Sequence, residues 1–78
     1  MATLRLFGPA RVEAGEARAE LAGRTVGQVL EAAEVRYGEP FARVVASSQI
    51  WVNGVAATTE DPVTDEDEVA VIPPVSGG

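Results

Sequence analysis

The residues of this chain best suited to chemistry stand at its C-terminal end, in the segment Pro73-Pro74-Val75-Ser76-Gly77-Gly78. Glycine has no Cβ, so a Ser-Gly-Gly tail can pass through a channel too narrow for other residues and expose its carboxylate inside another protein. The two prolines hold φ at roughly −65° and favour extended backbone before them, which directs the chain stiffly outward. The sequence therefore predicts a flexible tail over 75–78 whose reactive group is the carboxylate of Gly78. A frayed end without function is the alternative interpretation.

Most other catalytic chemistry is excluded by composition. The chain has no histidine and no cysteine, which leaves no thiolate nucleophile, no Ser-His-Asp triad and no zinc site of the usual kind. Ser47 and Ser48 therefore have no histidine to activate them. The acidic run 65–68 lacks the loop length, the spacing and the closing glutamate of a calcium site, so we interpret it as a solvated turn. We expect no bound metal, no cofactor and no catalytic activity of the chain's own.

The balance of charge narrows the choice of partners. Six arginines against twelve acidic residues give a formal net charge of −6, and a field of that sign repels nucleic-acid phosphates and anionic lipids. The longest apolar stretch is only a few residues, and the N-terminus lacks the features of a signal peptide. We expect a cytoplasmic protein that binds neither nucleic acid nor membrane. Its 78 residues allow one domain, over 1–74, followed by the tail.

Two strands are predicted before any helix. The alternation over 3–7 is typical of a strand with one buried face, and it places Leu4 and Leu6 on that face. A weaker alternation over 16–21 predicts a second strand paired with the first. The segment 10–15 carries no clear period and predicts no element.

A helix over 26–37 is predicted by its start signal and by its apolar spacing. Thr25 and Gln28 form a Thr-x-x-Gln capping box, and Gly38 stands where a left-handed cap would end the helix. The following residues, 39–45, predict a short turn or a single helical turn, because proline is tolerated at a first helical position. The residues expected to close the bottom of the core are Phe41 and Val44.

The rest of the chain predicts three more strands. Asn53-Gly54 between two apolar runs, 49–52 and 55–57, is the strongest short signal for a hairpin with a type I′ turn. The apolar run 69–72 is typical of a strand in the interior of a sheet.

The order of the elements predicts an α+β protein with the β-grasp (ubiquitin-like) fold, a mixed sheet of about five strands with one main helix on one face. A single helix leaves the other sheet face uncovered. The alternations place Phe7, Trp51 and Ile72 there, and we interpret them as a partner-binding surface. In the alternative, Trp51 is tucked under a loop.

Three segments together resemble a known family: Leu4–Arg11, Val52-Asn53-Gly54 and Val63–Gly78. They are similar to the MoaD/ThiS family of ubiquitin-like sulfur carriers, and within it to the small subunits of molybdopterin synthase. The resemblance covers the whole chain and is most specific from Pro73 to Gly78, because related thiazole-pathway carriers usually lack the Pro-Pro pair. Glu66 stands where the family often has glycine, which concerns the local turn only.

The resemblance implies a role as a sulfur carrier without catalysis of its own. A ubiquitin-activating-like adenylyltransferase would use ATP and Mg²⁺ to adenylate Gly78, and a sulfurtransferase would supply the sulfur of a thiocarboxylate. That thiocarboxylate would donate sulfur to cyclic pyranopterin monophosphate inside the large subunit of molybdopterin synthase, a heterotetramer. The catalytic residues would belong to the large subunit.

Three other functions stay open. The chain could carry sulfur for tRNA thiolation, cysteine synthesis or thiazole synthesis. It could be a ubiquitin-like modifier whose Gly78 is joined to target lysines, or a non-covalent adaptor with no use for its tail. Deleting Gly77 and Gly78 would separate an adaptor from the others, since only an adaptor would keep its function.

Overall fold

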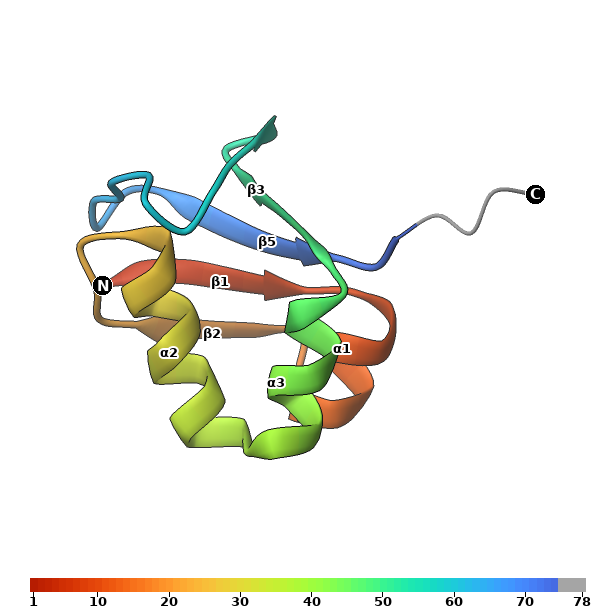
Figure 1. Ribbon diagram of the computed structural model, residues 1–78. Helices are drawn as coiled ribbons and strands as arrows, with labels where there is room; N and C mark the ends of the chain where they lie inside the picture. The colour runs from red at the N-terminus through yellow and green to blue at the C-terminus, as the bar shows by residue number, and fades with distance from the viewer. Residues whose placement is uncertain (75–78) are drawn as a thin grey trace.

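The predicted β-grasp architecture is confirmed by the computed structural model, which describes residues 1–74 (Figure 1). Over these residues the chain forms β1 (Ala2–Leu6), α1 (Gly8–Ala14), β2 (Arg18–Leu21), α2 (Val26–Tyr37), α3 (Glu39–Ala46), β3 (Gln49–Val52), β4 (Val55–Ala56) and β5 (Glu68–Ile72). The strands make one mixed sheet in the order β2-β1-β5-β3-β4, in which only the β1–β5 pair is parallel. The predicted tail over 75–78 lies outside the described residues.

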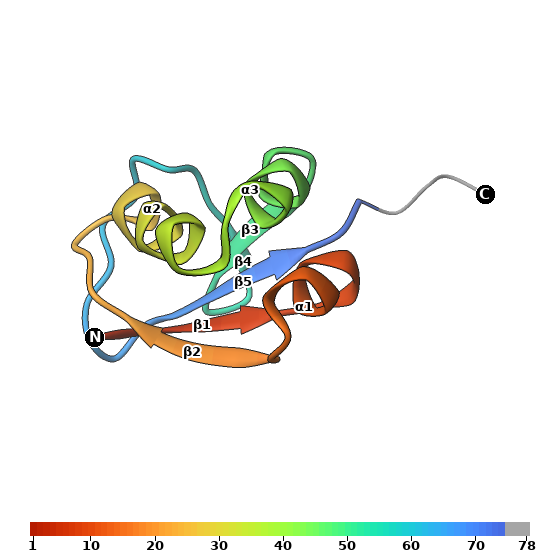
Figure 2. The same ribbon diagram turned by 90° about the horizontal axis from the view of Figure 1, so that it is seen from below.

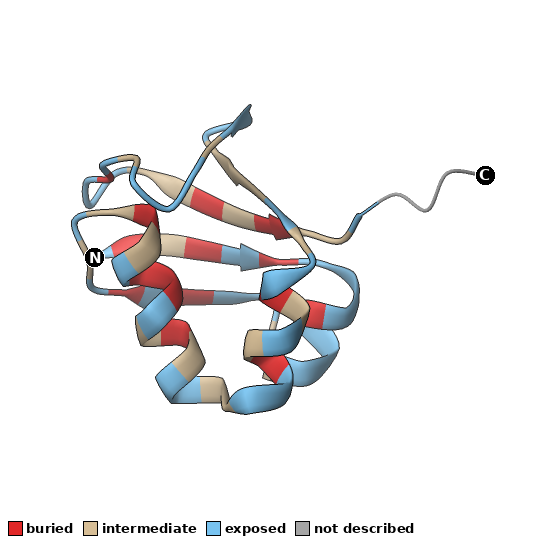
Figure 3. Cartoon of the chain, in the orientation of Figure 1, coloured by how far each residue is buried: buried red, intermediate tan, exposed pale blue. Residues whose placement is uncertain are grey.

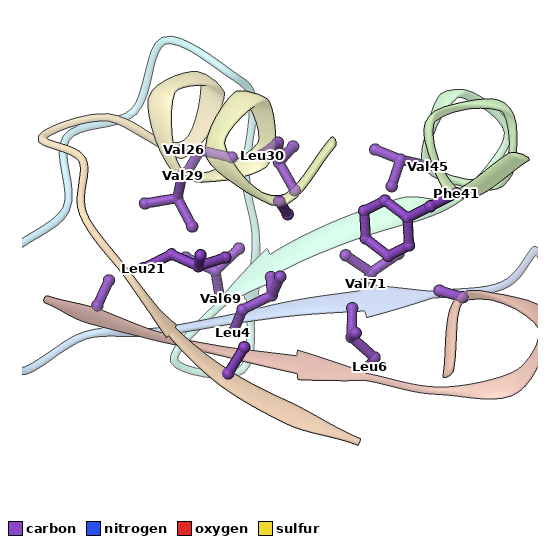
Figure 4. Close-up of a cluster of buried hydrophobic side chains, with 14 of the residues drawn as sticks. Leu4, Leu6, Leu21, Val26, Val29, Leu30, Phe41, Val45, Val69 and Val71 are labelled. Carbon is purple, nitrogen blue, oxygen red and sulfur yellow. The ribbon is translucent and has the colours of Figure 1, made fainter. Parts of the chain in front are cut away.

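The core lies between one face of the sheet and the helices (Figure 3). Leu4 and Leu6 of β1 and Val69 and Val71 of β5 point to this face and are almost completely buried, as Figure 4 shows. The period of two predicted for the first strand is therefore confirmed, and β5 is an interior strand as its apolar sequence indicates.

Helix α2 has the predicted bounds, and its N-terminus is capped by the predicted residues. The Thr25 hydroxyl oxygen accepts a hydrogen bond from the Gln28 amide at 3.2 Å, while the Gln28 side chain accepts from the Arg24 amide at 2.8 Å, one residue before the cap. The left-handed cap predicted at Gly38 is wrong. This residue has a positive φ of 95° but an extended ψ of −176°, because the chain turns directly into the next helix.

The single turn predicted after α2 is in fact an eight-residue helix, α3, with Pro40 in its first turn. Phe41 is fully buried as predicted, but Val45 is the second buried residue of the helix and Val44 is only half-buried. Residues i+3 and i+4 lie on the same helix face as residue i, so both valines pack against the core, and Val45 is the more deeply buried of the two.

Helix α1 was not predicted, because it has one buried residue, Ala10, and no apolar stripe. Its signals are Pro9 in the first turn and Gly15 just past the end, where Gly15 takes a left-handed φ of 76°. Helices α2 and α3 cover one side of the sheet, and α1 packs beside α3 where β1 and β5 end (Figure 2). One main helix was predicted, and the described residues contain three.

The predicted hairpin is confirmed, with β3 and β4 joined by a two-residue turn. Asn53 and Gly54 have φ values of 50° and 83°, the positive pair that a type I′ turn requires. The chain then crosses the start of α2, where the Val26 amide donates to the Asp61 carbonyl and the Gly27 amide to the Thr59 carbonyl, both at 2.9 Å.

Candidate functional site

The C-terminal segment leaves the sheet at the end of β5. Because β1 and β5 are parallel, this exit lies at the end of the sheet opposite Met1 (Figure 1). Pro73 is half-buried and Pro74 is exposed. The remaining predicted tail residues, Val75, Ser76, Gly77 and Gly78, lie outside the described residues, so their role stays a prediction.

The three residues predicted to bind a partner lie on the uncovered sheet face, and we call Phe7, Trp51 and Ile72 the open-face patch. Trp51 is paired with Ala70, two residues before Ile72 on β5, so both side chains point to the same face. Phe7 follows Leu6, whose partner in the parallel ladder is Val71, so it is beside Ile72. Phe7 is 40% exposed, and the other two are half-buried.

Neighbouring polar groups on this face hold the patch in place. The Arg5 guanidinium stacks over the Phe7 ring, 5.6 Å from its centroid, and the Trp51 indole N–H donates to the Gln49 side chain at 3.2 Å. Gln49 and Trp51 are on the same face of β3, so this hydrogen bond runs along the strand on the uncovered face.

The same face also carries charged and polar side chains from β1, β2 and β5. Here Arg5 pairs with Glu68 at 3.7 Å, and the Thr3 hydroxyl donates to Glu20 at 2.9 Å. These are exposed interactions of small net energy. The apolar patch therefore adjoins the exit of the C-terminal segment, and charged side chains border it, with Arg5 in contact with Phe7 of the patch itself.

The acidic run 65–68 has structural partners. Asp65 pairs with the N-terminal ammonium at 2.7 Å. Asp67 accepts hydrogen bonds from the Asn53 side chain at 2.9 Å and the Thr64 amide at 2.7 Å, and these bonds, the first above all, lower the pKa of its carboxyl group. Within residues 1–74 Asn53 alone among the non-glycine residues has a positive φ, so the turn at Glu66 forms without the left-handed backbone that favours glycine.

No group of three or more acidic, histidine or cysteine side chains in residues 1–74 is placed to hold a metal ion. No helix in the same range is long and apolar enough to cross a bilayer.

Sequence reasoning missed the helix that flanks the exit. Helix α1 contacts β5 and begins at Gly8, directly after the patch residue Phe7. The Gly8-Pro9 pair and Gly15 could have identified it, because proline inside the start and glycine past the end of a helix are a recognised asymmetry.

The chain is similar to one known protein family and to several solved structures. The model of the ThiS family matches residues 4–78. A search of curated proteins found no match.

Three of the solved structures similar to this chain cover nearly all of it. The small archaeal modifier protein 1 of Haloferax volcanii is 30% identical over 99% of this chain and 98% of its own, with a TM-score of 0.78. The chain matched in the BexX/CysO complex of Amycolatopsis orientalis is 26% identical with both chains fully covered and a TM-score of 0.84. A putative molybdopterin converting factor, subunit 1, of Pyrococcus furiosus is 28% identical over 95% of this chain and 97% of its own, with a TM-score of 0.82.

Proposed function

Because the chain belongs to the ThiS family and has the ubiquitin-like fold of its sulfur carriers, we propose that it carries sulfur as a thiocarboxylate on Gly78. The observation that carries the proposal is the Pro-Pro-Val-Ser-Gly-Gly ending directly after the interior strand β5, beside an apolar patch. In this proposal the chain is a sulfur-donating subunit without catalysis of its own, and it works in the cytoplasm with partner proteins.

The proposed chemistry begins with activation, since a carboxylate is a poor electrophile. A carboxylate oxygen of Gly78 attacks the α-phosphorus of ATP on a ubiquitin-activating-like adenylyltransferase, pyrophosphate leaves, and an acyl-adenylate forms. A sulfurtransferase then delivers a sulfur nucleophile at the oxidation level of hydrosulfide, which attacks the acyl carbon and displaces AMP. ATP, Mg²⁺ and the acid-base groups belong to the partners.

For the pathway we propose molybdopterin synthesis. Two copies of the chain, each carrying one sulfur as a thiocarboxylate, would supply the two sulfurs of one dithiolene. They would deliver them to cyclic pyranopterin monophosphate inside a heterotetramer with the large subunit. The Pro73-Pro74 pair and the similarity to a putative molybdopterin converting factor subunit support this assignment.

The open-face patch is proposed as the docking surface for these partners. It joins the exit of the C-terminal segment at Ile72, so a protein that covers the patch also lies next to the emerging chain. A relative solved as a complex, that of Amycolatopsis orientalis, supports a protein partner of some kind.

The pathway is tested by following the intact mass of the chain in a reconstituted reaction. The chain is first incubated with the adenylyltransferase, MgATP and a sulfur source, and then given the large subunit and cyclic pyranopterin monophosphate. We expect a gain equal to the exchange of one oxygen for sulfur, followed by its loss as molybdopterin appears. A gain that persists would overturn the molybdopterin assignment and leave the sulfur carrier.

The second candidate is a protein modifier, favoured by the similarity to a small archaeal modifier protein. In that case the acyl-adenylate would be attacked by the lysine amine of a target. Lysine-linked adducts that contain the chain and disappear when Gly78 is deleted would support this function.

A further inference from the structure

Gly8 and the Pro73 ring lie close together at the exit of the C-terminal segment. Leu6 is paired with Val71 in the parallel β1–β5 ladder, so the residues that follow both strands stay side by side. There the Pro73 ring lies against Gly8. A Cβ added to Gly8 would come within 2.9 Å of Pro73 Cγ and 3.6 Å of its Cβ and Cδ.

Neither side of this contact can yield easily. Gly8 has a left-handed φ of 56° and begins α1, which is anchored by the buried Ala10 and packs beside α3. The atom that a Cβ would meet belongs to a proline ring, which cannot rotate away as a flexible side chain would. A side chain at Gly8 would therefore have to shift the Pro73 ring, which is joined to the backbone at two atoms, or the turn at Gly8 itself.

Gly15, at the other end of α1, provides an internal comparison. It also has a left-handed φ, of 76°, but a Cβ added there would have nothing within 4 Å. Alanine at either position meets the same kind of backbone strain. Only alanine at Gly8 adds a clash with the C-terminal segment.

We propose that Gly8 is a positioning residue for the C-terminal tail. Its missing side chain lets the Pro73 ring lie against the turn between β1 and α1, and this contact sets the direction in which Pro73 and Pro74 leave the sheet. The consequence for activity rests on the proposed function. If the tail leaves the sheet in another direction, it reaches the partner's active site less often, although the open-face patch can still dock.

The first test measures the direction of the tail without any partner. Because the chain has no cysteine, a single nitroxide can be placed at Ser76→Cys and its paramagnetic relaxation effect measured on the amides of α1 and β3. We expect Gly8→Ala to change the pattern of affected amides and Gly15→Ala to leave it as in the parent chain. Identical patterns in the two variants would overturn the proposal.

The second test uses Pro73→Ala, which removes the ring atom at 2.9 Å and leaves Cβ at 3.6 Å, an ordinary contact. In the parent chain we expect Gly8→Ala to lower kcat/KM for adenylation about tenfold, with most of the loss in kcat. In the Pro73→Ala background, Gly8→Ala should cost no more than Gly15→Ala does. An equal loss in both backgrounds would contradict the contact.

The two experiments distinguish a failure of the proposed function from a failure of the proposed role of Gly8. If no variant, including the parent chain, is adenylated, the proposed function fails and the relaxation pattern still decides the role of Gly8. If Gly8→Ala does not fold, Pro73→Ala removes the same contact from the other side. An unchanged relaxation pattern in Pro73→Ala would then overturn the proposal.

Discussion

At the scale of single residues, Tyr37 is the group whose ionisation the fold changes most clearly. Its hydroxyl donates to the Glu16 carboxylate, which also pairs with Arg36 at 3.2 Å, and its ring lies 5.0 Å from that of Phe41. Burial, followed by the hydrogen bond and the charge of Glu16, raises the pKa of Tyr37 from 10.0 to about 12. The residue thereby ties the end of α2 to the turn before β2.

This shift predicts a loss of stability at alkaline pH. The pKa is higher in the folded chain, so the contribution of Tyr37 is complete below pH 10 and is lost as pH rises from 10 to about 12. Tyr37→Phe should remove this part of the pH dependence in urea unfolding. Since the chain has one tyrosine, an absorbance titration follows it directly. Glu16→Gln should lower the pKa of Tyr37, because it removes the charge of Glu16. Phenolate formation near pH 10 in the folded parent chain would contradict the account.

At the scale of elements, the junction between β2 and α2 is set by a close backbone approach. A Cβ on Gly23 would lie 2.8 Å from the Val29 amide nitrogen and 2.9 Å from Val29 Cγ2. We expect Gly23→Ala to lower the free energy of unfolding by about 1–3 kcal/mol, as overpacking does. The exposed neighbour provides the control, because Ala22→Ser should change it by less than about 0.5 kcal/mol. Urea unfolding followed by Trp51 fluorescence measures both, and equal stability of the two variants would be inconsistent with the close approach.

The open-face patch predicts a separable loss of binding. Ile72→Arg places a charge on the uncovered face and leaves the core residues of β5, Val69 and Val71, untouched. It should weaken binding to the large subunit or the adenylyltransferase by tenfold or more, roughly the effect of losing a central interface residue. Val35→Arg is the matched control, since Val35 is 88% exposed on α2, on the other side of the sheet. If calorimetric titration shows that the Ile72→Arg and Val35→Arg variants bind the partner with equal affinity, the patch is not part of the interface.

The elements also show what sequence could and could not predict. The bounds of α2 followed from Thr25 and its apolar spacing, and the hairpin followed from Asn53-Gly54, because these signals are local. Helix α1 was missed because Ala10 is its one buried residue, so no apolar stripe marks it in the sequence. The contact of Gly8 with Pro73 joins residues far apart in the chain, so it needed the register of β1 against β5.

At the scale of the whole molecule, we expect the core and the proposed reactive end at Gly78 to be independent of each other. Within residues 1–74, the buried apolar cluster runs from Ala2 to Val71 and includes no residue after β5. Deleting Gly77 and Gly78 should therefore change the free energy of unfolding by less than about 0.5 kcal/mol while abolishing sulfur transfer. Thermal unfolding of both chains and a sulfur-transfer assay check this together. A large loss of stability would show that the tail contributes to the fold, and sulfur transfer retained by the shortened chain would show that sulfur is not carried on Gly78.

The central claim is that sulfur is carried on the carboxyl group of Gly78. It is tested most directly by fragmentation mass spectrometry of the chain after incubation with an adenylyltransferase, MgATP and a sulfur source. The account predicts that one oxygen is exchanged for sulfur in the C-terminal fragment that contains Gly78, and that a chain ending at Gly77 gains nothing. A chain that is adenylated but never acquires sulfur at Gly78, or that acquires it elsewhere, would contradict the claim.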